Sequence, residues 1–117
     1  MVKAISLKEP WASLILKGKK TIETRTWKTN YRGVLLICVS KTPNSEISGK
    51  AIAVANLVDC RLMTKEDENK ACCKIYAGAY SWVLASVKPI KKFVVKGRLG
   101  LYDVPFEEQT SIKKFPT

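Results

Sequence analysis

Three charged residues close together in the chain, Lys20, Glu23 and Arg25, have side chains that could bind a polar ligand. They follow Gly18, which is expected to end a short helix, and Glu23 and Arg25 alternate along a predicted strand, so both project from one face. The Glu23 carboxylate could accept from the exocyclic amine of a nucleobase, while Lys20 and Arg25 hold phosphate or carbonyl oxygens. The competing interpretation is that Glu23 and Arg25 form only a structural ion pair.

Aromatic and basic side chains are interleaved just after this strand, at Trp27, Lys28, Tyr31 and Arg32. This arrangement is typical of surfaces that stack bases while holding their phosphates. The alternative is that the two aromatic rings only cover one end of the fold. Two other tryptophans, Trp11 and Trp82, have the spacing of core residues, and a buried indole N–H at Trp82 would need a hydrogen-bond acceptor.

The charge of the chain favours a polyanionic partner such as RNA. Its 117 residues contain 21 Lys and Arg against 10 Asp and Glu, a formal net charge of +11. Residues 1–41 hold nine basic and two acidic residues, and residues 88–98 hold five basic residues and no acid. If the fold brings these two stretches to one side, they form a continuous positive rim around the site.

The cysteine pattern does not indicate a metal centre. Cys38, Cys60, Cys72 and Cys73 include no C-x-x-C pair, and the chain has no histidine. We therefore expect no metal, no cofactor and reduced thiols in a cytoplasmic protein. The first residues lack the apolar run of a signal peptide, and no stretch has the length and hydrophobicity of a membrane span, so we expect no membrane association.

The hydrophobic pattern predicts a single α+β domain over residues 1–117, built as a small mixed β-barrel flanked by two short helices. Helices are predicted from Pro10 to Gly18 and from Thr64 to Cys73, the second with a capping box between Thr64 and Asp67. The residues after Pro105 are expected to be irregular. The predicted strands are Val2 to Leu7, Thr21 to Trp27, Val34 to Val39, Ala51 to Leu62, Tyr80 to Val87, Phe93 to Val95 and Gly97 to Val104.

Several of these segments resemble the ASCH domain, a member of the PUA-like group. They are AISLKEPWASLILKGKKTIETRTW, TNYRG, VLLICVSK, AIAVANLVDC and VKGRLGLYDVP, together with Tyr80 and Trp82. The resemblance implies a β-barrel with a cleft beside the first helix, and RNA or nucleotide ligands. We therefore expect an RNA- or nucleotide-binding protein that uses a basic cleft between the first helix and the following strand.

The resemblance also implies a hydrolase alternative, because some relatives are amidohydrolases acting on acetylated cytidine and others are proposed ribonucleases. Lys20 matches the catalytic lysine of the amidohydrolases, but Glu23 stands where their threonine nucleophile is expected. A hydrolase would then use Lys20 and Glu23 as catalytic residues, with Glu23 as a base toward water. A later glutamate of the pattern could correspond to Glu66 or Glu68. Cys38 stands where close relatives carry histidine, and we expect it to be a buried, inert thiol.

Overall fold

The computed structural model describes residues 1–107 of the chain. The last part of the irregular tail predicted over 105–117 therefore lies outside the described residues. Within 1–107 no helix combines the length and apolar character needed to cross a bilayer. The elements are β1 (Val2–Leu7), α1 (Trp11–Leu16), β2 (Ile22–Arg25), β3 (Gly33–Val39), β4 (Lys50–Leu62), the 3₁₀ turn η1 (Lys65–Asp67), α2 (Glu68–Ala71), β5 (Tyr80–Val94) and β6 (Tyr102–Val104).

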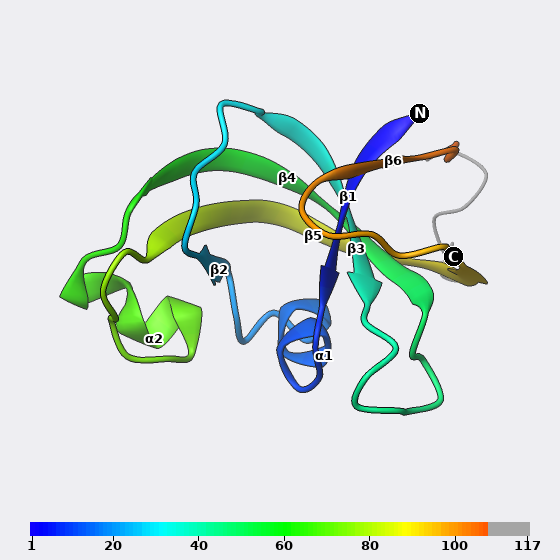
Figure 1. The fold of residues 1–117 in the computed structure, drawn as a ribbon, viewed down its shortest axis with the longest axis horizontal. Helices are drawn as coiled ribbons and strands as arrows, with labels where there is room; N and C mark the ends of the chain where they lie inside the picture. The colour runs from blue at the N-terminus through cyan, green and yellow to red at the C-terminus, as the bar shows by residue number, and fades with distance from the viewer. Residues whose placement is uncertain (108–117) are drawn as a thin grey trace, which may run out of the picture.

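The strands form one mixed sheet in the order β2-β5-β4-β3-β1-β6. β1 pairs with β3 in parallel, and the other neighbours are antiparallel. The long strands β4 and β5 curve strongly, and α1 lies inside their arc while α2 lies at one end beside β2 (Figure 1). This arrangement confirms the α+β class and the two short helices that flank the sheet.

Side-chain alternation divides the core between the two faces of the sheet. Leu35 and Ile37 of β3 join Trp82 and the α1 residues Ala12 and Ile15 in one buried cluster. The intervening Leu36 and Cys38 pack on the other face, against side chains from β5 and β6. The expected core position of Trp82 is confirmed, and its indole Nε1 donates to the Trp27 carbonyl at 3.2 Å.

The barrel prediction is wrong, because the sheet is not closed. Within residues 1–107, β2 and β6 are its two edges, with 4 and 3 residues, and β2 pairs only with β5 while β6 pairs only with β1. Closure would require a ladder between these two edges, and among residues 1–107 none joins β2 to β6. A seam is left between β2 and the end of β1.

The strands predicted separately over Tyr80 to Val87 and Phe93 to Val95 are one 15-residue strand, β5, which continues through Pro89. Its register with β4 shifts on both sides of the Ala53–Pro89 pair, and Ser86 has a φ of 54°. Irregular pairing of this kind tolerates a proline that cannot donate to the ladder. The strand predicted from Gly97 to Val104 is reduced to Tyr102–Val104.

The predicted capping box is confirmed, because Thr64 and Asp67 exchange hydrogen bonds at the start of η1. Asp67 is buried and also accepts from Arg61 at 2.6 and 2.9 Å and from Ser81 at 2.9 Å. The Arg61 guanidinium, helped by Thr64 and Ser81, holds the pKa of Asp67 well below its ordinary value.

Cys38 is fully buried, and burial raises the pKa of its thiol to about 11, as expected for an inert thiol.

Replacing Asp67 tests this network. A carboxyl group with a lowered folded-state pKa stabilises the fold above the ordinary aspartate pKa, and this contribution is lost as the pH falls below about 4. Asp67→Asn should therefore lower the free energy of unfolding by about 2 kcal/mol at pH 7, and the deficit should shrink toward pH 3 in urea titrations. Asp59→Asn removes a half-exposed partner of Arg61 and should cost less than about 1 kcal/mol. Equal losses for the two variants would contradict this account.

Candidate ligand-binding site

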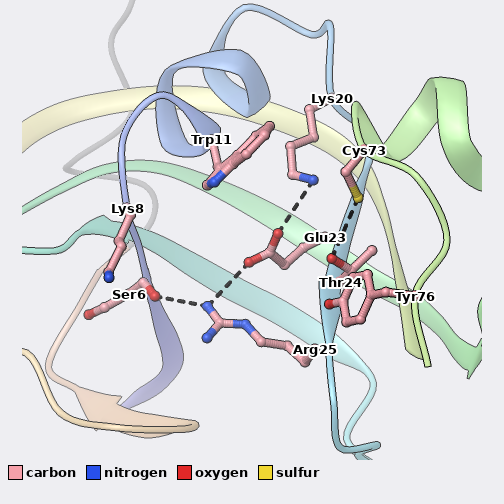
Figure 2. A pocket seen from close by; sticks show the side chains of 9 residues that line it. All are labelled: Ser6, Lys8, Trp11, Lys20, Glu23, Thr24, Arg25, Cys73 and Tyr76. Atoms are coloured by element: carbon pink, nitrogen blue, oxygen red, sulfur yellow. Dashed lines mark hydrogen bonds and ion pairs between the residues drawn. The ribbon is translucent and has the colours of Figure 1, made fainter. Parts of the chain in front are cut away.

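A hollow of about 320 Å³ lies at the open seam, between the end of β1, the start of α1 and the strand β2 (Figure 2). Its volume is at the lower end of the range for small-molecule sites. It is lined by Ser6, Lys8, Trp11, Lys20, Glu23, Thr24, Arg25, Cys73 and Tyr76.

The Glu23 carboxylate is the centre of the hollow and is contacted by a cation on each side (Figure 2). Its Oε1 lies 3.4 Å from the Lys20 Nζ, and its Oε2 lies 3.2 Å from an Nη of Arg25. Lys20 is almost fully buried, and Glu23 is only 9% exposed. The structure shows the ion pair of the competing interpretation, at the inner wall of an open hollow, and the ligand role of the cluster stays a prediction.

Arg25 also bridges the seam between the two strand edges. Its Nη2 donates to the Ser6 carbonyl of β1 at 2.8 Å, although β1 and β2 share no ladder. The Lys20 ammonium donates to the carbonyl of Ala71 at the end of α2. The cluster therefore joins β1, β2 and α2 around the hollow.

The cluster has a net positive charge and hydrogen-bonding groups that its internal contacts do not fully use. Two cations face one carboxylate, which leaves a net positive charge, and Lys8 adds a further exposed cation to the lining. A carboxylate has about four acceptor sites, so Glu23 can accept further hydrogen bonds. Among the described residues, Arg25 Nε is the buried side-chain nitrogen without a hydrogen-bond partner.

Two exposed aromatic rings flank the carboxylate. Trp11 is 36% exposed and Tyr76 is 41% exposed, and they lie on opposite sides of Glu23 in Figure 2. The core assignment of Trp11 is wrong, because the inward face of α1 is formed by Ala12 and Ile15. The Trp11 ring instead covers the Lys20 ammonium, whose Nζ lies 5.3 Å from the ring centroid.

The four residues predicted just after β2 do not line this hollow. Trp27 packs edge-on against Trp82, with ring centroids 4.8 Å apart. The Tyr31 hydroxyl donates to the Val34 carbonyl. The Arg32 guanidinium donates to backbone carbonyls, and its Nη2 lies 3.7 Å from the Asp59 Oδ1. Lys28 is exposed. The structure thus unites Lys20, Glu23 and Arg25, while the ligand roles of Trp27, Lys28, Tyr31 and Arg32 stay predictions.

The sequence reasoning missed six of the lining residues: Ser6, Lys8, Trp11, Thr24, Cys73 and Tyr76. Cys73 and Tyr76 follow α2, about fifty positions from β2 in the chain, and no local pattern marks them. Glu66 and Glu68 do not line the hollow, and a Glu68 oxygen accepts from the Ile75 N–H. Within residues 1–107, no three side chains of His, Cys, Asp or Glu are grouped as metal ligands.

This chain is similar to known proteins in sequence and in fold. The family model of the ASCH domain matches residues 5–94. Mouse activating signal cointegrator 1 is 25% identical over 137 aligned positions, covering 94% of this chain, but this chain spans only 23% of that protein's length.

Crystal structures of the ASCH protein from Zymomonas mobilis share the fold. One structure superposes with a TM-score of 0.63 at 17% identity, covering 92% of this chain and 90% of that one. A tyrosine-to-phenylalanine variant of the same protein gives a TM-score of 0.66 at 16% identity, covering 92% and 93% of the two chains. Because the family match extends over most of its length, this chain belongs to the ASCH domain family.

Proposed function

We propose that this protein binds RNA by accepting one base of a single strand in the hollow beside Glu23. The observation that carries this proposal is a carboxylate held between two cations and flanked by two exposed aromatic rings. Unpaired bases are recognised in this way, by stacking on aromatic side chains and by hydrogen bonds to their edges. The proposal keeps the predicted cleft but assigns stacking to Trp11 and Tyr76.

The chemistry of the hollow favours a base with an exocyclic amine. Glu23 offers only acceptor oxygens, and the amine of cytosine or adenine is a donor that can reach such a carboxylate. Uracil presents carbonyl oxygens on both sides of its single ring N–H and has no amine. Arg25, at the edge of the hollow, is placed to hold the phosphate that follows the base.

The family supports RNA as the general kind of ligand, because the ASCH domain is a PUA-like RNA-binding fold. The net charge of +11 agrees with a polyanionic partner.

Tryptophan fluorescence tests the proposed stacking, because Trp11 lines the hollow whereas Trp82 is buried and Trp27 packs against Trp82. An oligocytidine tetramer should quench the emission of the wild-type protein more strongly than an oligouridine tetramer. Trp11→Phe should lose most of this quenching, and the matched control Trp27→Phe should keep it. Trp11→Ala should weaken binding by about 1 to 3 kcal/mol, the usual value of one base–aromatic stack. Unchanged quenching in Trp11→Phe would refute the site.

Hydrolysis stays an alternative with its own test. Both Glu23 oxygens already contact cations, an arrangement suited to holding a ligand. If the protein binds its ligand without hydrolysing it, chromatography should recover acetylated cytidine and short RNA intact after incubation with the protein. Product formed by the wild-type protein and lost in Glu23→Gln would establish the hydrolase instead. Asp103→Asn, outside the hollow, is the control for contaminating activity.

A further inference from the structure

A second hollow, of about 500 Å³, adjoins the first across the Arg25–Ser6 bridge. Both residues line both hollows. The second hollow is otherwise formed by the end of β3, the start of β4 and the segment that joins β5 to β6. Its further lining residues are Val39, Ser40, Lys41, Gly49, Val95, Lys96, Gly97, Arg98, Leu99 and Gly100.

The lining of the second hollow is strongly basic. Lys41, Lys96 and Arg98 are exposed in its lining, Arg25 is half-buried there, and the lining contains no acidic residue. Within residues 1–107, no ion pair joins Lys41, Lys96 or Arg98 to a carboxylate. Here the basic stretches 1–41 and 88–98 of the sequence meet, and their charge is free to bind phosphate.

The segment 96–100 is held against the sheet at the boundary of the two hollows. A Cβ atom at Gly97 would lie 3.2 Å from the Ser6 Oγ, a tight contact that the serine would have to relieve by shifting, so glycine favours this close approach to β1. Gly100 has a φ of 68°, which also favours glycine. Leu99 is 98% exposed between these glycines and offers an apolar contact for a ribose or base.

We infer that the ligand is an RNA strand at least two nucleotides long, which crosses the Arg25–Ser6 bridge. One base occupies the first hollow, as in the proposed function on which this inference rests. The next phosphates lie in the second hollow, held by Lys41, Lys96 and Arg98, and Leu99 contacts the adjoining nucleotide. A free nucleotide fills only the first hollow and leaves these cations unpaired.

The test measures how affinity depends on RNA length. Cytidine monophosphate and oligocytidines of two to six nucleotides are titrated against the wild-type protein at fixed salt, with Trp11 quenching as the readout. The double variant K96E/R98E removes two cations of the second hollow. The matched control K91E/K92E makes the same change of charge at two exposed β5 positions outside it. Thermal melts of each variant verify the fold.

The wild-type affinity should rise about tenfold or more from the mononucleotide to the tetranucleotide, because the second hollow adds a linked contact. K96E/R98E should lose this gain and keep mononucleotide binding within about twofold, while K91E/K92E keeps most of the gain. For the tetranucleotide, the slope of log affinity against log salt should be shallower by about 1 to 2 in K96E/R98E than in the wild type.

Three outcomes would overturn the inference. Equal wild-type affinity for mononucleotide and tetranucleotide refutes it and leaves the proposed function standing. Equal losses in the two double variants would mean that only diffuse charge attracts the RNA. No quenching by either ligand refutes the proposed function together with this inference. Phosphatidylserine vesicles serve as a further probe of the second hollow. If the wild-type protein binds these vesicles, K96E/R98E does not, and RNA affinity is independent of length, the second hollow is assigned to a lipid surface instead.

Discussion

The pairing of Glu23 with Lys20 and Arg25 is the interaction on which the site depends. Lys20 and Glu23 are almost completely removed from water, and removing charges from water costs several kcal/mol per ion unless partners compensate. Each charge has such partners: Lys20 also binds the Ala71 carbonyl, and Arg25 also binds the Ser6 carbonyl. These contacts offset the cost of burying the cluster at the wall of a hollow.

This cluster substitutes for the missing strand pairing at the seam. β2 is short, and among residues 1–107 no ladder joins it to the end of β1, so the Arg25 guanidinium spans this gap by donating to the Ser6 carbonyl. A backbone hydrogen bond ties α2 to the residue before β2 at the same place, because the Thr21 N–H donates to the Lys70 carbonyl at 2.9 Å. The segment after α2, which carries Tyr76, is thereby held across the hollow from Trp11. The open seam is what makes room for a ligand between rigid elements.

The sequence predicted what local patterns determine. Strand-like composition and apolar runs located β1, β3 and β4, and the spacing of Thr64 and Asp67 identified the start of the second helical segment. The spacing of Lys20, Glu23 and Arg25 was enough to identify the cluster, because these residues lie within one turn and one short strand.

The missed features depend on contacts between distant parts of the chain. Tyr76 reaches the hollow only through the packing of α2 on β2, and the burial of Ala12 in place of Trp11 reflects how closely α1 approaches the sheet. Pro89 was predicted to end a strand. The strand continues through it because the irregular pairing of β5 with β4 accommodates a proline there, and this pairing has no local signal in the sequence. Whether the sheet closes likewise depends on pairing between strands far apart in the sequence, which no local signal specifies.

A crystal structure of the protein with a bound oligocytidine tetramer tests the central claim most directly. The account predicts one base between Trp11 and Tyr76 with its exocyclic amine on the Glu23 carboxylate, and the strand continuing past Arg25 toward Lys96 and Arg98. RNA bound instead around Trp27, Lys28, Tyr31 and Arg32, with the seam empty, would contradict it.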